Sequence, residues 1–439
     1  MADESHSRPP GFLRATGREW VRLLSIRPVA PPALLWRVSR WWWGTVIRES
    51  APQLALVAAF VLGLLLLLGA AGSTAGIVAL ALLGAVLAWE LRHAYLAHRS
   101  VARIEEALEG IERGEEGPKV PRSHLVIPPL AFVTRGVRRE RGVRFAELDG
   151  TNLRLDVYRP ADDDPHDDIL HPAVIQVHGG GWLAGSRYEQ GIPLLNHLAS
   201  IGWVGFNIDY RLSPEATWPA QIVDVKRAIA WVRSNASELA IDPDRIAITG
   251  GSAGGHLTAL AALTANDPAF QPGFEEADTS VFAAVPFYGV YDLTNERGHY
   301  YPELQSWAFE RVVLKKPLAS NEELYRAASP RFRVHAGAPS FMVIHGERDT
   351  LVPVADARDF VAELAAVSDS DVRYVELPGA EHAFDLWPSA RTARIADAIA
   401  RFLAAELEAA GAPASSTDDN AAAAGGPRMV QTASTASDT

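Results

Sequence analysis

The chain has 439 residues, a formal net charge of −12 and no cysteine. The length allows two or three folded units, and the lack of cysteine excludes a disulfide framework, a thiolate metal site and a cysteine nucleophile. Residues 1–50 carry a net charge of +4 and the rest of the chain −16, and so acidic a main body argues against nucleic-acid binding.

Residues 1–50 form a basic leader that contains eight arginines. A helix over residues 12–27 could lie on an anionic membrane surface, because its arginines would face the headgroups. A disordered, arginine-rich leader is the alternative.

An uncharged block follows, since residues 50–89 contain no Asp, Glu, Lys, Arg or His. One membrane span needs about 20 apolar residues, so residues 51–91 predict a transmembrane hairpin with spans over 51–69 and 74–91. The alternative is a buried apolar hairpin within a soluble domain. Aromatic residues flank the block as they do at membrane interfaces: Trp36, Trp41, Trp42, Trp43, Trp89 and Tyr95.

The arginines around the block predict its orientation. Three precede it and three follow it: Arg37, Arg40, Arg48, Arg92, Arg99 and Arg103. Because the short connection between the spans is uncharged, the positive-inside rule places both ends in the cytoplasm. We therefore expect a multi-pass protein of the cell membrane with a cytoplasmic catalytic domain, whereas a single span would place that domain outside.

The remaining chain predicts an α/β domain over residues 136–410. Residues 92–135 predict an amphipathic helix over 99–114 and then a linker, and residues 141–160 predict a β-hairpin that turns at Asp149-Gly150. Helical patterns alternate with further strands, which favours a doubly wound, mostly parallel sheet. The Ala-, Ser- and Thr-rich residues 411–439 predict a disordered tail. The further strands are expected over 173–177, 203–209, 246–249, 282–288, 341–345 and 372–377.

The most informative motif is Gly250-Gly251-Ser252-Ala253-Gly254, between a strand pattern and an apolar helical pattern. A Gly-x-Ser-x-Gly in this position is a nucleophile elbow. Its outer glycines, Gly250 and Gly254, allow strand and helix backbones to approach closely. The motif predicts that Ser252 is a nucleophile held at the head of a helix, where amide groups stabilise negative charge.

A second motif, His178-Gly179-Gly180-Gly181-Trp182, follows the strand expected over residues 173–177. Acyl transfer needs donors aimed at the oxygen that becomes negative, and glycine amides reach it without side-chain obstruction. We expect the amides of Gly180, Gly181 and Ala253 to form the oxyanion hole.

Asp349 and His382 follow the last two expected strands. A serine hydroxyl becomes a good nucleophile when a histidine takes its proton and an acid orients that histidine. The order Ser252, Asp349, His382 is that of α/β-hydrolases. Competing acids are Glu347 and Asp356, the latter expected in the next helix and pointing away. A further acid, Glu381, is expected to face solvent.

These motifs occur in one order, completed by Asp209-Tyr210-Arg211-Leu212-Ser213-Pro214 between the glycine run and the elbow. Residues of about 140–408 thereby resemble the hormone-sensitive-lipase group of α/β-hydrolase serine esterases. With the apolar block, the whole chain is similar to membrane-associated esterases of mycobacteria and related actinobacteria. The group usually has an acidic residue where this chain has Gly251. The elbow sequence also resembles feruloyl or acetylxylan esterases and formamidases.

Residues around these motifs have supporting roles. We expect Asp209 and Arg211 to organise the loop near the oxyanion hole, together with His178 and Gly179. Trp182 and Tyr288 are candidates for the substrate pocket. Residues 295–329 interrupt the alternation and predict either a cap over the pocket or a surface helical pair.

The sequence therefore predicts a membrane-anchored serine carboxylesterase or lipase that acts on carboxylic, acyl or lipid esters. Alternatives are a carbohydrate acetyl or feruloyl esterase, an aryl-formamidase, or a catalytically silent hydrolase-fold scaffold. No metal-ligand spacing, P-loop or dinucleotide fingerprint appears, so neither a cofactor nor a metal is expected. The sequence leaves the oligomeric state open.

Overall fold

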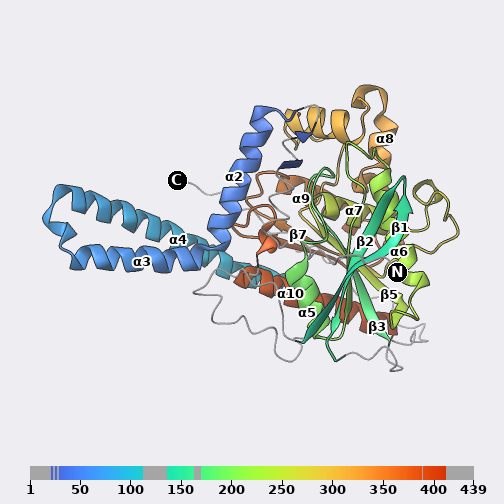
Figure 1. Ribbon diagram of the computed structural model, residues 1–439, viewed down its shortest axis with the longest axis horizontal. Coiled ribbons are helices and arrows are strands. Elements are labelled where there is room, and N and C mark those ends of the chain that lie inside the picture. Colours follow the sequence, from blue (N-terminus) through green and yellow to red (C-terminus); the bar gives the residue numbers. More distant parts are fainter. Residues whose placement is uncertain are drawn as a thin grey trace, which may run out of the picture.

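One eight-stranded sheet forms the centre of the protein (Figure 1). The computed structural model describes residues 21–22, 25–26, 29–111, 136–162, 170–387 and 389–411. The spatial order of the strands is β1-β2-β4-β3-β5-β6-β7-β8. The strands are β1 (Val137–Leu148), β2 (Thr151–Pro160), β3 (His171–Val177), β4 (Val204–Ile208), β5 (Ile241–Gly251), β6 (Ala283–Phe287), β7 (Ser340–Gly346) and β8 (Val372–Leu377).

The direction of the strands confirms the predicted mostly parallel sheet. β1 and β2 form the antiparallel hairpin expected from the sequence, and β2 also runs antiparallel to β4. The strands from β4 to β8 are all parallel. Asp149 and Gly150 both have positive φ values, of 51° and 74°, as a two-residue hairpin turn requires.

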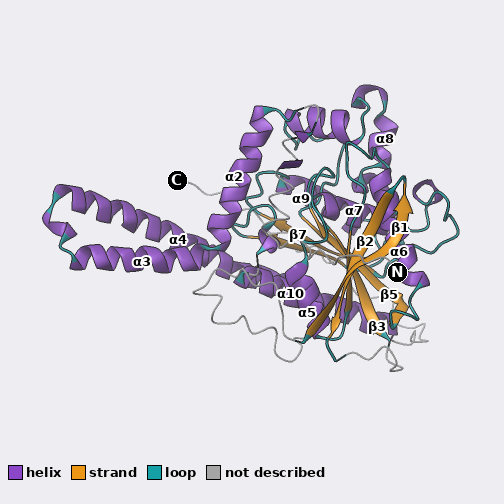
Figure 2. Cartoon of the chain, in the orientation of Figure 1, coloured by secondary structure: helices purple, strands orange, loops and turns teal. Residues whose placement is uncertain are grey.

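Helices cover both faces of the sheet (Figure 2). One face packs against α6 (Ala220–Ser234), α7 (Ala253–Leu263) and α9 (Val354–Ala365). The other packs against α5 (Ile192–Ser200), α10 (Ala390–Gly411) and the end of α4. Shorter elements connect them: η3 (Pro268–Phe270), the π-helical η4 (Leu304–Val313), η5 (Leu318–Ser320), α8 (Glu322–Ala327), η6 (Pro330–Arg333) and η7 (Phe384–Leu386).

The uncharged block forms a helical hairpin that projects from the domain (Figure 1). It consists of α3 (Ala51–Leu67), η1 (Ala70–Gly72) and α4 (Thr74–Ala107). Among the described residues, α4 alone is long and apolar enough to cross a membrane. α3 passes the same test only together with α2 (Pro32–Glu49), from which it is bent by 71°.

α4 is longer than the sequence suggested. The second expected span and the first part of the amphipathic helix expected over residues 99–114 form one continuous helix of 34 residues. No proline interrupts this stretch, so the helix continues, and Ile104, Ala107 and Leu108 are buried in the domain. The linker expected over residues 114–129 lies outside the described residues.

The last part of the leader forms a helix that the sequence analysis did not predict. Residues 32–49 form α2, which packs on the catalytic domain, so Trp41 and Trp42 are half-buried there rather than facing lipid. Trp36 and Trp43 remain exposed. The helix expected over residues 12–27 lies largely outside the described residues, as do residues 412–439 of the expected tail.

The close approach of α7 to β3 gives a test of the fold. A Cβ at Gly254 would lie 2.1 Å from the carbonyl oxygen of Val177, a backbone atom that cannot move aside. We expect Gly254→Ala to lower the free energy of unfolding by about 3 kcal/mol, the upper end of the usual overpacking cost. Denaturant unfolding measures this. Gly84→Ala is the control, since its Cβ would meet nothing within 4 Å, and an equal stability of the two variants would contradict the explanation.

Candidate active site

Ser252 occupies the sharp turn between β5 and α7. Its φ of 59° and ψ of −119° are unusual for a residue with a side chain, and such strain persists where the surroundings fix it. The amide of Ser252 donates to the carbonyl of Phe287 (3.0 Å), and its own carbonyl accepts from the amide of His256 (2.9 Å). The turn therefore holds the hydroxyl of Ser252 at the wall of a cavity.

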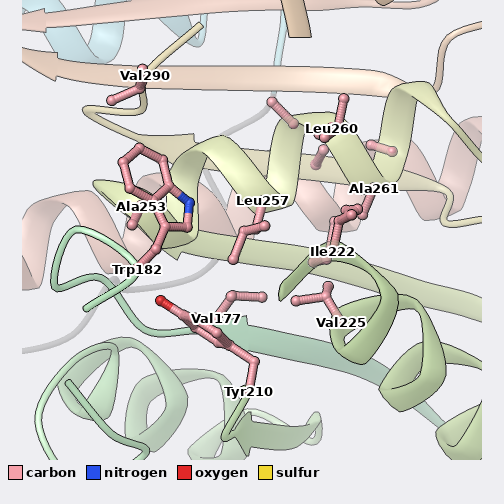
Figure 3. Close-up of a cluster of buried hydrophobic side chains, with 14 of the residues drawn as sticks. Val177, Trp182, Tyr210, Ile222, Val225, Ala253, Leu257, Leu260, Ala261 and Val290 are labelled. Carbon is pink, nitrogen blue, oxygen red and sulfur yellow. The ribbon is translucent and has the colours of Figure 1, made fainter. Parts of the chain in front are cut away.

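The cavity has a volume of about 240 Å³ and a mainly apolar lining. Its walls come from α2, from the loop after β3, from the start of α7, from residues 301–308 and from the loop that follows β8. Figure 3 shows the indole of Trp182 next to Ala253 at the first turn of α7. Ser252 and His382 line this same cavity, so an ester in it could meet both.

Asp349 and His382 are hydrogen-bonded as the sequence suggested. Nδ1 of His382 lies 2.6 Å from Oδ2 of Asp349, and both side chains are buried. Burial alone would raise the pKa of Asp349, but the charge of His382 and hydrogen bonds from two histidines hold it well below its usual value. The carboxylate thus stays ionised and keeps the proton on Nδ1, which leaves Nε2 free to accept one.

His345 is a partner of Asp349 that sequence reasoning missed. Its Nε2 lies 3.3 Å from Oδ2 of Asp349 and 2.9 Å from the carbonyl of Val352. The amides of Leu351 and Val352 donate to Oδ1 of the same carboxylate at 2.9 and 2.8 Å. These contacts fix the carboxylate on both sides. The available signal was the position of His345 at the end of β7, four residues before Asp349.

The loop after β3 presents glycine amides to the cavity. Gly180 and Gly181 have positive φ values, of 110° and 63°, and both line the cavity with Ala253. Within the described part of the chain, the amides of these three residues donate to no protein acceptor. Because Ala253 begins α7, the positive end of that helix faces the same space. The arrangement can bind a developing oxyanion.

The side chain of His178 packs against the glycine loop that follows β3 and supports it. It is buried and stacks on Tyr210 with a ring separation of 4.3 Å, and its Nδ1 lies 2.8 Å from the carbonyl of Gly179. Burial lowers the pKa of His178 to about 4, so the imidazole is neutral. Gly179 is confined too, since a Cβ there would lie 2.6 Å from the carbonyl oxygen of Gly251.

Asp209 and Arg211 have different roles. Asp209 accepts from the amide of Arg187 at 3.1 Å and forms an ion pair with its guanidinium, which also contacts Asp156 at 2.9 Å. Asp209 thus holds the segment that follows the glycine loop, and Arg187 is a residue that sequence reasoning missed. Arg211 instead contacts Asp224 at 2.8 Å and so joins its loop to α6.

The two pocket candidates also differ. Trp182 lines the cavity and donates from Nε1 to Nδ1 of His256 at 3.2 Å. Tyr288 does not line it, so that prediction is wrong. Tyr288 is fully buried with its ring 4.5 Å from that of His382, and it donates to Asp385. Burial raises the pKa of Asp385 to about 6.

Tyr288 explains the glycine before the nucleophile. A Cβ at Gly251 would lie 2.6 Å from the hydroxyl oxygen of Tyr288 and 2.9 Å from its ring. The tyrosine thus fills the space that an acidic side chain at position 251 would need.

The neighbouring acids are all engaged elsewhere. Glu381 is 2% exposed, so the expectation that it faces solvent is wrong: it accepts from the amide of Thr350 at 2.6 Å and pairs with Arg48. Glu347 accepts from the amide of Gly379. Asp356 lies in α9, as expected, and accepts from the amide of Tyr291 and the hydroxyl of Tyr300.

Two segments outside the sequence motifs described above contribute further apolar walls of the cavity. The segment expected as a cap contributes Tyr301, Leu304, Trp307 and Ala308. α2 contributes Leu34, Leu35, Val38, Trp41 and Trp42. Among the described residues no cluster of three or more His, Asp or Glu side chains is arranged to hold a metal ion.

Comparison with known proteins shows the family to which the chain belongs. The BD-FAE family model matches residues 155–364. The esterase LipC of Mycobacterium tuberculosis is 44% identical over 309 residues, which cover 69% of this chain and 74% of LipC. The chain belongs to the hormone-sensitive-lipase group of α/β-hydrolase esterases.

Two further relatives in this group match over a smaller share of their length. The probable carboxylic ester hydrolase LipM of M. tuberculosis is 50% identical over 62% of each chain. The esterase LipQ of the same organism is 49% identical over 58% of this chain and 59% of LipQ. The matched region therefore spans about three fifths of the length of these two relatives.

Solved structures share the α/β-hydrolase fold. A truncated carbohydrate esterase from gut microbiota has a TM-score of 0.52 and 26% identity over 62% of this chain and 96% of its own. A butyrate-bound esterase of Thermogutta terrifontis has a TM-score of 0.51 and 28% identity over 63% of this chain and 94% of its own.

The contact between Gly251 and Tyr288 can be tested by substitution. We expect Gly251→Ala to lower the free energy of unfolding by about 1–3 kcal/mol, because the new methyl group must displace a fully buried ring. In Gly251→Ala/Tyr288→Leu the methyl has room, so the loss should be smaller than the sum of the single losses. Denaturant unfolding of all four proteins measures the coupling. Additive losses would show that the two residues do not compete for this space.

Proposed function

We propose that the protein is a membrane-anchored serine carboxylesterase or lipase. The observation that carries this proposal is the convergence of Ser252, His382 and the glycine amides on one apolar cavity, with Asp349 2.6 Å from Nδ1 of His382. The esterase names of the relatives support the same class of reaction.

In the proposed reaction, Oγ of Ser252 attacks the ester carbonyl while Nε2 of His382 takes the hydroxyl proton. The carbonyl oxygen becomes negative and accepts hydrogen bonds from the amides of Gly180, Gly181 and Ala253. His382 then gives the proton to the leaving alcohol, and an acyl-enzyme remains. Water, deprotonated by His382, releases the acid and restores Ser252.

The chemistry of the walls favours acyl substrates. The cavity is lined by aliphatic and aromatic side chains from α2, from residues 301–308 and from the loop after β8, and apolar walls suit an acyl chain. The likeness to a carbohydrate esterase favours a second candidate, deacylation of a carbohydrate by the same residues. Hydrolysis of an aryl-formamide would use the same nucleophile, histidine and glycine amides.

We also propose that α3 and α4 span the cell membrane as a hairpin, with the catalytic domain in the cytoplasm. The exposed apolar side chains of α3 and the first half of α4 support lipid contact. At 1.5 Å per residue, the 17 residues of α3 measure about 26 Å, close to the ~30 Å of a hydrocarbon core. The arginines before α3 and after the apolar half of α4 favour the cytoplasmic side.

Loss of the nucleophile tests the reaction. We expect Ser252→Ala to lower kcat by several orders of magnitude, because the hydroxyl forms the covalent intermediate. A p-nitrophenyl ester series from acetate to palmitate, with full-length protein in detergent, measures this and identifies the preferred chain. A peak at long chains would support a lipid substrate. Activity on acetylated sugars alone would support the second candidate, and a Ser252→Ala variant as active as the unchanged protein would refute the mechanism.

The absence of cysteine from the sequence permits a direct test of topology. Ser73→Cys puts a thiol between the two spans, and Asp244→Cys puts one on the catalytic domain, where that side chain is 92% exposed. In intact cells we expect a membrane-impermeant maleimide to label position 73, and position 244 only after lysis. Labelling of position 244 in intact cells would place the catalytic domain outside.

A further inference from the structure

Helix α2 contacts the candidate catalytic histidine directly. Nε1 of Trp41 and Oγ1 of Thr45 both donate to the backbone carbonyl of His382, at 2.7 and 2.8 Å. The indole of Trp41 also lies edge-on to the imidazole, with ring centroids 5.9 Å apart. Two side chains one helical turn apart thus fix the backbone of the residue whose side chain must meet both Ser252 and Asp349.

The same face of α2 holds the residues on either side of His382. Arg48 pairs with Glu381, and Glu49 pairs with Arg391 and accepts from Ser389 at 2.8 Å. Glu49 and Arg391 each have side chains only 2% exposed, and an ion pair so deeply buried is costly to break. α2 is therefore bound near the start of the segment between β8 and α10, at Glu381 and His382, and at its end, at Ser389 and Arg391.

The opposite face of α2 carries large side chains that are exposed in the described part of the chain. Trp36 and Trp43 are 62% and 63% exposed, and Ile47 is 37% exposed. With the exposed Arg40 they follow one another at intervals of three or four residues, so they share one side of the helix. Tryptophan, arginine and isoleucine on one face suit the boundary between lipid headgroups and acyl chains.

The direction of α2 agrees with such a contact. α2 meets α3 at a bend of 71°. If α3 crosses the bilayer near its normal, α2 therefore lies within about 20° of the membrane plane. In Figure 1, α2 stands beside the domain while α3 and α4 project from it.

We propose that α2 is a membrane-surface helix: its outer face binds the bilayer interface, and its inner face positions His382 and walls the substrate cavity. This inference rests on the proposed function and deepens it, because it assigns Trp41 and Thr45 as positioning residues for the general base. A misplaced base slows the chemical step more than it weakens binding.

The inner face is tested by removing the two donors: Thr45→Val keeps the shape of the side chain, and Trp41→Phe keeps an aromatic ring. Trp41→Phe and Thr45→Val each leave one donor on the His382 carbonyl, so we expect kcat to fall by less than about threefold. The double variant leaves a buried carbonyl without either donor, and kcat should fall at least about tenfold. KM for p-nitrophenyl acetate, a short ester that needs little of the apolar wall, should change by less than about twofold.

The matched control on the same helix is Ser39→Ala, at an exposed position that is assigned to neither face, which should keep kcat and KM. A double variant with unchanged kcat would overturn the positioning role. A double variant that loses activity only in proportion to its unfolded fraction would overturn it too. A failure of the proposed reaction is distinguishable from a failure of the positioning role. In that case Ser252→Ala would be as active as the unchanged protein.

The outer face is tested with single thiols in the cysteine-free chain. Arg40→Cys and Asp244→Cys are labelled with an environment-sensitive dye and reconstituted in phosphatidylcholine vesicles that contain spin-labelled lipid. We expect strong quenching at position 40 and little at position 244. Equal quenching at the two positions would overturn the membrane contact of α2. A failure of the hairpin itself would appear differently, as a loss of the protein from the vesicles.

Discussion

The contact between the start of α7 and the end of β3 is the constraint on which the candidate site depends. Gly254 can approach the carbonyl of Val177 because it has no side chain. This approach puts Ser252 and Ala253 directly beside the glycine loop that follows β3. A nucleophile and its oxyanion donors thus come from two strands that are neighbours in the sheet but about 70 residues apart in the chain.

Much of the fold could be predicted because its signals are local. The strand and helix patterns, the Asp149-Gly150 turn and the mostly parallel sheet follow from residues close together in sequence. The pairing of Asp349 with His382 was also foreseeable, since both follow parallel strands and the carboxyl ends of such strands share one edge. Their catalytic roles, and that of Ser252, stay predictions.

The parts that sequence reasoning missed depend on distant contacts. Glu381 resembles a surface residue until Arg48, more than 300 positions away, pairs with it. Tyr288 follows a strand that ends near the cavity. Its ring nevertheless packs against that of His382, and its hydroxyl donates to Asp385. Trp41 belongs to an aromatic cluster typical of membrane interfaces, and nothing nearby in the sequence indicates that its indole donates to His382.

The packing of Tyr288 against Gly251 has an evolutionary consequence. A relative with an acidic residue before its nucleophile must make room for that side chain, so the position equivalent to 288 should there carry a smaller residue or a ring turned elsewhere. An acidic residue at position 251 that appeared first would clash with Tyr288. A smaller residue at position 288 that appeared first would leave a cavity. The two positions should therefore vary together among these esterases, and the pair would mark separate lineages within the group.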